Sequence, residues 1–357
     1  EIAQCLVGSE MCIRDREIYM KVVVDAFGGD NAPLEVVEGA VLAIKENKDL
    51  TVVLCGDENK IKEILKGRTE RIEIVNASEV ITNDDVPTVA IRQKKDSSLV
   101  KAFDLLKEDE NIIGLVSAGS TGAILSGAIM KIGRIKGISR PALAPILPTK
   151  KGGDVIIIDS GANVDCKSVN LLHFAIMGSA YYSIVENVKE PRGALLNNGS
   201  EEHKGNELLK ETYPLMKKLP INFVGNCEGK EVMGGDVDVI VTDGFAGNVL
   251  LKGVEGTASA ILSVLKSEIK ARPMSMIGAL FMKKTFKVLK TKLDANKHGG
   301  APFLGCKKLV VKNHGSCGRT NICASINQVI KLHENNLISK IEKMVGEMTD
   351  KIEAQND

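Results

Sequence analysis

Short apolar runs alternate with segments of helical periodicity along most of this chain. Runs of strand length, many rich in β-branched residues, occupy residues 21–25, 51–56, 72–75, 112–116, 154–159, 193–196, 221–224, 237–241 and 308–312. Apolar positions recur with helical spacing between them, as at residues 58–66, 88–107 and 249–269. This alternation predicts an α/β fold with a mostly parallel, Rossmann-like sheet wrapped by helices.

Polar and glycine residues directly follow several of these strands. They occupy residues 25–30, 117–122, 159–167, 197–206, 243–248 and 313–316. In open parallel sheets, ligands bind beyond the carboxyl ends of the strands, where the chain order reverses. We therefore expect these loops to form one shared site.

The loop at residues 117–122 joins a predicted strand to a predicted helix. Backbone N–H groups are free at a helix N-terminus, glycine permits close approach, and hydroxyls add donors, so this loop is a candidate anion cradle. The candidate phosphate-binding residues are Ser117, Gly119, Ser120, Thr121 and Gly122. The alternative is an ordinary strand-to-helix turn in which Ser120 or Thr121 caps the helix.

The composition indicates which binding partners are disfavoured. Lys and Arg total 47 against 46 for Asp and Glu, aromatic residues make up 3%, and Trp is absent, which disfavours nucleic acid. The eight cysteines form no C-x-x-C pair and fit a reducing cytosol. We found no apolar run of the roughly 18 residues needed to span a bilayer, so we expect any membrane contact to be peripheral.

Segments at both ends differ from the rest of the chain. Residues 1–19 have no clear period and precede a plausible start at Met20, so we expect them to be an extraneous leader. Residues 20–335 are expected to form the α/β domain, and residues 336–357 a charged helical tail that is either a dimer arm or loosely held.

Several familiar catalytic signatures are missing. The sequence has no G-x-G-x-x-G, no P-loop, no H-E-x-x-H and no G-x-S-x-G, so it predicts neither a bound cofactor nor a metal. Gly225 to Gly229 imitates a nucleophile elbow around Cys227, but no apolar helix follows it, which disfavours a catalytic cysteine.

A helical hairpin is predicted at about residues 249–293. The long apolar helix breaks at Arg272-Pro273, and lysines 283, 284, 287, 290 and 292 follow the apolar tip. Such a tip can contact an anionic membrane, an acyl chain or an acidic carrier, or instead pack in a dimer interface. The residues assigned to membrane or acyl contact are Met274, Met276, Ile277, Leu280, Phe281 and Met282.

Eight short motifs follow one another along the chain. They are DAFGGDNAP at 25–33, SAGSTGA at 117–123, RPALAP at 140–145, DSGANVDCK at 159–167, KGNE at 204–207, DGFAGNVLLK at 243–252, GGAPFLG at 299–305 and HGS at 314–316. Together they resemble the bacterial phosphate acyltransferase family, which transfers an acyl group from acyl carrier protein to phosphate. The resemblance runs from Met20 nearly to the C-terminus, with Phe27 where the family usually has Met and Ser120 where it usually has Asn.

The resemblance implies a fold similar to phosphotransacetylases and to isocitrate or isopropylmalate dehydrogenases. Inorganic phosphate would attack long-chain acyl-acyl carrier protein and yield acyl phosphate for phospholipid synthesis, with no covalent enzyme intermediate. The family resembled acts as a cytoplasmic homodimer at the inner membrane surface, without a cofactor. It passes its product to a membrane glycerol-3-phosphate acyltransferase.

The roles of further residues are expectations. Lys204 would offset negative charge, Asp243 would orient the nucleophile or carrier arm, and Asn248 and His314 would stabilise the oxyanion. The alternatives are a solvated capping loop around Lys204 and a simple turn at Asp243. Residues assigned to substrate binding or to the loops are Asp25, Gly28, Gly29, Asp30, Asp159, Asn163, Asp165, Lys167 and Asn206.

Two other functions remain open from the sequence. A phosphotransacetylase acting on short acyl-coenzyme A would share the fold and phosphate cradle but would not need the methionine-rich hairpin. A non-catalytic α/β scaffold would use the same loops only to cap helices. A nicotinamide-dependent dehydrogenase is disfavoured by the missing glycine fingerprint.

Overall fold

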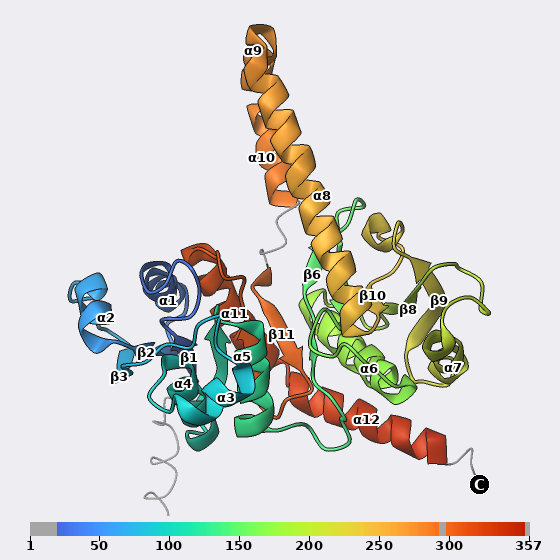
Figure 1. The fold of residues 1–357 in the computed structure, drawn as a ribbon, viewed down its shortest axis with the longest axis horizontal. Coiled ribbons are helices and arrows are strands. Elements are labelled where there is room, and N and C mark those ends of the chain that lie inside the picture. Colours follow the sequence, from blue (N-terminus) through green and yellow to red (C-terminus); the bar gives the residue numbers. More distant parts are fainter. Residues whose placement is uncertain (1–19, 293–297, 354–357) are drawn as a thin grey trace, which may run out of the picture.

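The computed structural model describes residues 20–292 and 298–353, without the side chains of residues 289–292 and 350–353. The expected leader at residues 1–19 and the side chains of Lys290 and Lys292 lie outside this description. The described chain is a mostly parallel α/β protein, and the strands are divided between two sheets (Figure 1). The sequence had suggested one sheet.

The larger sheet carries the N-terminal strands and two strands from near the C-terminus. Its order is β3 (Ile72–Asn76), β2 (Leu50–Gly56), β1 (Met20–Asp25), β4 (Ile112–Ser117), β12 (Leu309–Lys312), β11 (Ala301–Leu304) and β5 (Ala142–Leu143). The strands from β3 to β12 are parallel, whereas β11 runs antiparallel to both β12 and β5. Because β2 and β4 lie on opposite sides of β1, the chain order reverses there.

The smaller sheet is built from the middle of the chain. Its order is β6 (Ile146–Pro148), β7 (Asp154–Ile158), β10 (Val239–Val241), β8 (Arg192–Asn197) and β9 (Asn222–Glu228). Only β6 is antiparallel to its neighbour. Two residues, Ala144 and Pro145, separate β5 from β6 and link the sheets.

The remaining helices of the body cover these sheets. The expected helix at residues 88–107 is two helices, because Ser97 caps a new one by accepting a hydrogen bond from the Val100 N–H at 3.4 Å. The helices are α1 (Leu34–Glu46), α2 (Glu58–Leu65), α3 (Pro87–Gln93), α4 (Ser98–Glu108), α5 (Thr121–Gly127) with a π-helical extension (Ala128–Ile132), α7 (Glu207–Met216), a 3₁₀ turn (Val232–Gly234) and α11 (Arg319–Glu334).

Helix α6 (Ser168–Val185) joins the two halves of the core. It is apolar on all sides and buried along most of its length, as expected for a helix packed on every face. It packs on β7 and β10 of the smaller sheet, and its Tyr181 hydroxyl accepts a hydrogen bond from Gln328 on α11 at 2.5 Å. Because α11 packs on β4 and β12, one hydrophobic cluster extends across both sheets.

The C-terminal segment is an integral helix of the fold. Helix α12 (Leu337–Glu353) lies against α6, and one face of it buries Leu337, Ile341, Val345 and Met348 (Figure 1). The i, i+4 and i+3 spacing of these residues places them on one stripe. The burial of these four residues contradicts the expectation of a loosely held tail for this part of the helix.

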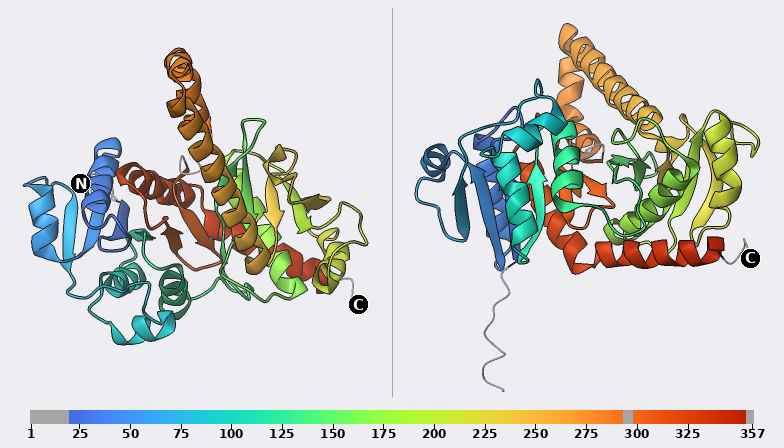
Figure 2. Two further views of the ribbon diagram at one scale, coloured as in Figure 1. Left: turned by 45° about the horizontal axis from the view of Figure 1, so that its top comes forward. Right: turned by 60° about the horizontal axis from the view of Figure 1, so that its bottom comes forward.

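A long helical hairpin projects from the body of the molecule (Figures 1 and 2). It consists of α8 (Gly244–Ala271), α9 (Pro273–Phe281) and α10 (Lys283–Lys292). By length and composition alone, α8 is the described helix that is long and apolar enough to cross a membrane. No such helix was expected from the sequence. The first turns of α8 nevertheless pack within the α/β body, where Gly244, Gly247 and Leu251 are buried.

We predict that α12 contributes directly to stability. Ile341→Ala removes a side chain that is 1% exposed and should lower the free energy of unfolding by about 2–5 kcal/mol. The matched control is Lys343→Ala on the exposed face of α12, which should change it by less than about 0.5 kcal/mol. Urea denaturation followed by circular dichroism measures both. Equal stability of the two variants would contradict the packed arrangement.

Candidate functional site

A cavity of about 410 Å³ lies at the point where the chain order of the larger sheet reverses. This is where ligands bind in open parallel sheets. The loops after β1, β4 and β12 and the segment after β3 enclose it. Its lining residues are Phe27, Gly29, Asp30, Val80, Ile81, Thr82, Asn83, Ala118, Gly119, Ser120, Thr121, Lys312, His314 and Gly315.

The predicted phosphate loop forms one wall of this cavity. Gly119, Ser120 and Thr121 line it, and α5 begins at Thr121. The first N–H groups of a helix have no acceptor within the helix, so they are available to an anion. Ser120 occupies the position before α5 but makes no side-chain capping hydrogen bond. The cap predicted as an alternative is therefore absent at Ser120.

Two residues of the predicted cradle contact other parts of the protein and not the cavity. Ser117 is buried, and its hydroxyl donates to Asp25 Oδ2 at 2.7 Å and accepts from the Gly119 N–H at 3.1 Å. Gly122 faces α3, where an added Cβ would lie 2.7 Å from Pro87 Cγ. Neither residue lines the cavity, whereas Gly119, Ser120 and Thr121 do, and phosphate binding by this loop stays a prediction.

The loop after β1 forms another wall of the cavity. Asp25 is buried, and its burial raises the pKa of its carboxyl group. A Cβ on Gly28 would lie 2.5 Å from Asp25 Oδ2 and 2.8 Å from the Gly119 nitrogen, so this close approach requires glycine. The Asp30 N–H donates to the Gly315 carbonyl at 2.8 Å, which joins this loop to the one after β12. Gly29 and Asp30 face the cavity.

A second, smaller cavity of about 120 Å³ shares Lys312 and His314 with the first. It lies between the two sheets at the base of α8. Its lining residues are Leu143, Pro145, Ile146, Leu147, Ser160, Leu251, Lys252, Glu255, His298, Gly299, Gly300, Ala301, Lys312 and His314. The His314 Nδ1 atom is within 2.9 Å of the Ser316 hydroxyl.

The loop at residues 159–167 is organised by its own side chains. The buried Asp159 carboxylate accepts hydrogen bonds from the N–H groups of Leu143, Ala162 and Asn163, and burial raises its pKa against these hydrogen bonds. The Asn163 amide donates to Asp159 and to the Pro141 carbonyl. The side chains of Asp159 and Asn163 thus form hydrogen bonds that hold this loop in place.

The other two predicted residues of this loop contribute backbone contacts at its exposed end. The Asp165 carbonyl accepts a hydrogen bond from Arg140 at 2.7 Å, and the Lys167 N–H donates to Asn170 in the first turn of α6. Both residues are exposed, and neither lines the two cavities.

The predicted catalytic residues do not all lie at the two cavities. His314 lines both cavities. Asn248 is exposed on α8, three and four residues before Leu251 and Lys252, and therefore on the same helix face as these cavity residues. Asp243 caps α8 by accepting from the Ala246 N–H at 2.8 Å. This helix cap is a local role, although the alternative expected from the sequence was a simple turn.

Lys204 lies in the exposed loop after β8 and lines neither cavity. Its neighbour Asn206 caps α7 by accepting from the Leu209 N–H at 3.0 Å. The capping loop that the sequence offered as an alternative therefore exists.

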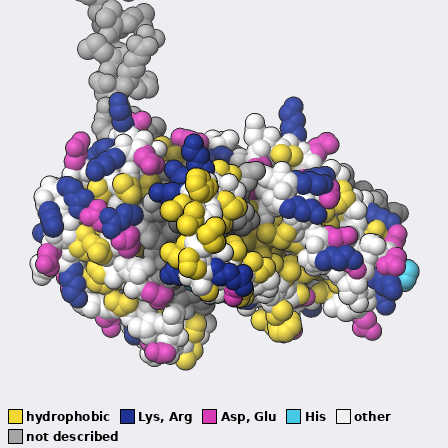
Figure 3. Space-filling view, turned by 90° about the horizontal axis from the view of Figure 1, so that it is seen from above, with side chains coloured by type: hydrophobic (Ala, Val, Ile, Leu, Met, Phe, Trp, Pro, Cys, Tyr) yellow, Lys and Arg dark blue, Asp and Glu magenta, His cyan; other side chains and the backbone are white. Residues whose placement is uncertain are grey.

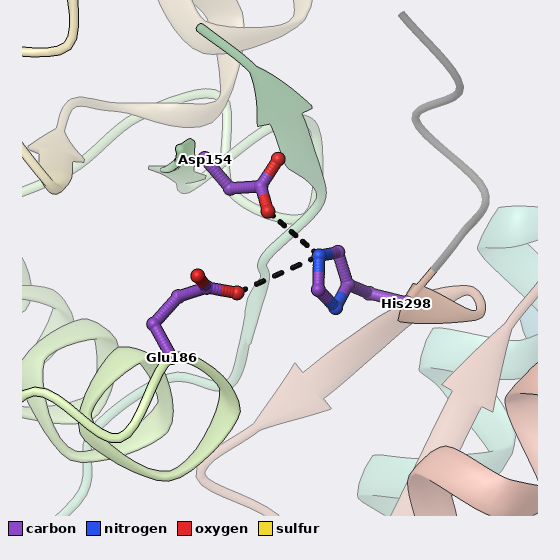
Figure 4. Close-up of side chains that lie close together, drawn as sticks. All are labelled: Asp154, Glu186 and His298. Carbon is purple, nitrogen blue, oxygen red and sulfur yellow. Dashed lines mark hydrogen bonds and ion pairs between the residues drawn. The ribbon is translucent and has the colours of Figure 1, made fainter. Parts of the chain in front are cut away.

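A cluster at the return of the hairpin went unnoticed in the sequence. His298 Nε2 lies 2.7 Å from Asp154 Oδ2 and 3.5 Å from Glu186 Oε1 (Figure 4). These are residue types that bind Zn²⁺, and one ligand atom from each lies within 4.8 Å of the others. The short contact between His298 and Asp154 is that of a hydrogen-bonded pair, which ties the hairpin to β7 and α6.

Sequence reasoning also missed Lys312 and the segment at residues 80–83 in the wall of the larger cavity. The signal for Lys312 was a charged residue at the end of an apolar strand, directly before a polar loop. The surroundings of Cys227 agree with the sequence argument against a nucleophilic role. The residue is buried within β9, and burial raises the pKa of Cys227 to about 11.

The fold is similar to that of solved phosphotransacetylases. One from Streptococcus pyogenes has a TM-score of 0.56 at 16% identity, covering 90% of this chain and 96% of its own. EutD phosphotransacetylase from Staphylococcus aureus has a TM-score of 0.55 at 16% identity, covering 88% and 94%. At this identity the similarity concerns the fold alone.

Sequence relatives extend over nearly the whole chain. The model of the family described as "Fatty acid synthesis protein" matches residues 20–340. A phosphate acyltransferase of Clostridium tetani is 47% identical, covering 91% of this chain and 97% of its own length. One of Alkaliphilus oremlandii is 48% identical, covering 93% and 99%. The chain therefore belongs to the phosphate acyltransferase family, whose members are acyltransferase enzymes.

Proposed function

We propose that this enzyme transfers a long-chain acyl group from acyl carrier protein to inorganic phosphate, giving acyl phosphate for phospholipid synthesis. The observation that carries the proposal is the cavity at the reversal point of the larger sheet. Its walls combine the free amides of α5, the hydroxyls of Ser120 and Thr121, and the side chains of Lys312 and His314. These groups suit a phosphate anion.

Phosphate needs little activation for this reaction. With a second pKa of about 6, it is largely a dianion at neutral pH, so the enzyme has mainly to position and desolvate it. His314 in the cavity and Asn248 on the adjoining face of α8 are the proposed donors to the carbonyl oxygen. Lys204 and Asp243 are proposed at the periphery, facing the carrier, because neither lines the cavity.

The proposal includes peripheral binding to the inner membrane through the hairpin. At its tip, Phe281 is 87% exposed, Met274 78% and Leu280 72%, and Lys283, Lys284 and Lys287 follow directly. Viewed along the hairpin, a hydrophobic patch carries basic side chains at its edges (Figure 3). This arrangement suits insertion at an anionic membrane surface. Product would pass there to a membrane glycerol-3-phosphate acyltransferase.

The same surface also suits a second copy of the chain, because large exposed apolar patches mark interfaces. We propose a homodimer in solution. Besides the hairpin tip, Ile261, Leu262 and Val264 on α8 are exposed.

We predict phosphate-dependent release of free thiol from palmitoyl-acyl carrier protein by the chain starting at Met20. A hydroxylamine-reactive acyl phosphate should accumulate in equal amount. Acetyl-coenzyme A, assayed in parallel, tests the alternative that the chain is a phosphotransacetylase, an enzyme class whose fold is similar. Turnover of acetyl-coenzyme A alone would replace the proposed substrate, and a folded protein inactive on both would refute acyl transfer to phosphate.

We predict that Thr121→Val weakens use of phosphate. Loss of one hydrogen bond to a charged ligand costs about 1.5–3 kcal/mol, so kcat/KM for phosphate should fall about ten- to hundredfold, mainly through KM. Ser126→Ala is the control, because it removes a hydroxyl from the same helix outside the cavity. If the two variants had the same KM for phosphate, the proposed cradle would be in the wrong place.

We predict that changing Met276, Ile277 and Phe281 together to Asp abolishes sedimentation with liposomes containing phosphatidylglycerol, because it places charge in the apolar tip. The control changes three exposed apolar residues of the body, Leu34, Val86 and Val89, to Asp. Size-exclusion chromatography of both variants separates a loss of lipid binding from a loss of dimer. Unchanged sedimentation of the hairpin variant would exclude it as the membrane contact.

A further inference from the structure

The two cavities meet at one cationic side chain. Lys312 ends β12, opposite Ser117 of β4 in the register, and it lines the polar cavity and the smaller cavity alike. The smaller cavity has an apolar wall formed by Leu143, Ile146, Leu147 and Leu251. Lys312 therefore lies between a cavity suited to an anion and a cavity in which an apolar wall faces the ion pair of Lys252 and Glu255.

The ammonium group of Lys312 has no direct partner. It makes no hydrogen bond or ion pair with any residue in the described part of the chain. Its neighbour Lys252 on α8 is different, because Glu255 pairs with it at 2.7 Å. Burial, and then the positive charge of Lys252, lower the pKa of Lys312, and the smaller opposing effects of Cys317 and Glu255 do not cancel this shift. A partly buried cation in these surroundings is destabilised unless an anion binds beside it.

We propose that the smaller cavity holds the acyl thioester, and that the Lys312 ammonium, between the two cavities, pairs with the acceptor phosphate as it meets the thioester carbonyl. This inference rests on the proposed function and adds to it a catalytic residue and a site for the acyl group. At about 120 Å³ the cavity accommodates only the carbons nearest the carbonyl. The rest of a long chain would follow α8 outward, past exposed Ile261 and Leu265.

The position of Lys312 suits the charge changes of the reaction. An oxygen of HPO₄²⁻ attacks the carbonyl carbon, a C–O bond forms, and the C–S bond breaks with its electron pair on sulfur. The proton of the phosphate passes to the thiolate, so acyl phosphate and free thiol balance the step. Negative charge moves from phosphate toward the carbonyl oxygen, and a cation between the cavities stabilises both positions.

The test is Lys312→Met, which keeps the length of the side chain and removes its charge. We expect kcat/KM for phosphate to fall about ten- to hundredfold in this variant. Lys312→Arg, which keeps the charge, should retain part of the lost activity. Lys307→Met is the control, since Lys307 is exposed just before the same strand and lines neither cavity. Leu251→Phe should instead raise KM for palmitoyl-acyl carrier protein while leaving KM for phosphate unchanged.

A measurement independent of turnover uses phosphate as the probe. Phosphate should raise the melting temperature of the parent chain and of Lys307→Met, and should raise that of Lys312→Met much less. This comparison also establishes that each variant is folded. Kinetic constants and phosphate-induced stabilisation of Lys312→Met equal to those of the parent would overturn the assignment of Lys312. An inactive parent chain would instead refute the proposed function.

Discussion

The hydrogen bond from Ser117 to Asp25 joins the two loops on which the candidate site is built. Both side chains are buried, and their oxygens are 2.7 Å apart. A buried carboxylate must find donors, so Asp25 draws the loop after β4 onto the end of β1. The absence of a side chain at Gly28 lets the two backbones meet. As a result, Gly119, Ser120 and Thr121 are turned toward the cavity instead of into the core.

The smaller sheet places the second half of the site by a similar packing constraint. A Cβ on Gly247 would lie 1.9 Å from the Asp159 carbonyl oxygen, so only glycine allows the first turn of α8 to sit on that loop. This contact directs Leu251 and Lys252 toward Lys312 of the larger sheet. At the other end of the hairpin, His298 is tied to Asp154 and Glu186. Both ends of the projecting hairpin are thus anchored beside the smaller cavity.

Much of the fold could be predicted from the sequence because its longer strands are continuous apolar runs. The division into two sheets could not, because it depends on β5, β6 and β11, which have only two to four residues and no usable periodicity. The hairpin was predicted from its break at Arg272-Pro273, but α8 begins at Gly244, before the apolar stretch that marked it.

The candidate site was only partly predictable for a different reason. Sequence pattern shows which polar residues follow strands, but it does not show which of them are satisfied by neighbouring groups. Ser117, Asp159 and Asn206 are bound to the protein itself. Lys312 looked like an ordinary strand end, and its proposed role depends on α8 and on the loop after β4, both distant in sequence.

We propose above all that phosphate binds where the two cavities meet. A crystal structure of the chain starting at Met20, grown with inorganic phosphate, tests this proposal most directly. We predict phosphate against the amides of Ser120 and Thr121, with the Lys312 ammonium within hydrogen-bonding distance. Phosphate bound instead at the exposed loop around Lys204, with Lys312 left free of it, would contradict the proposed binding site.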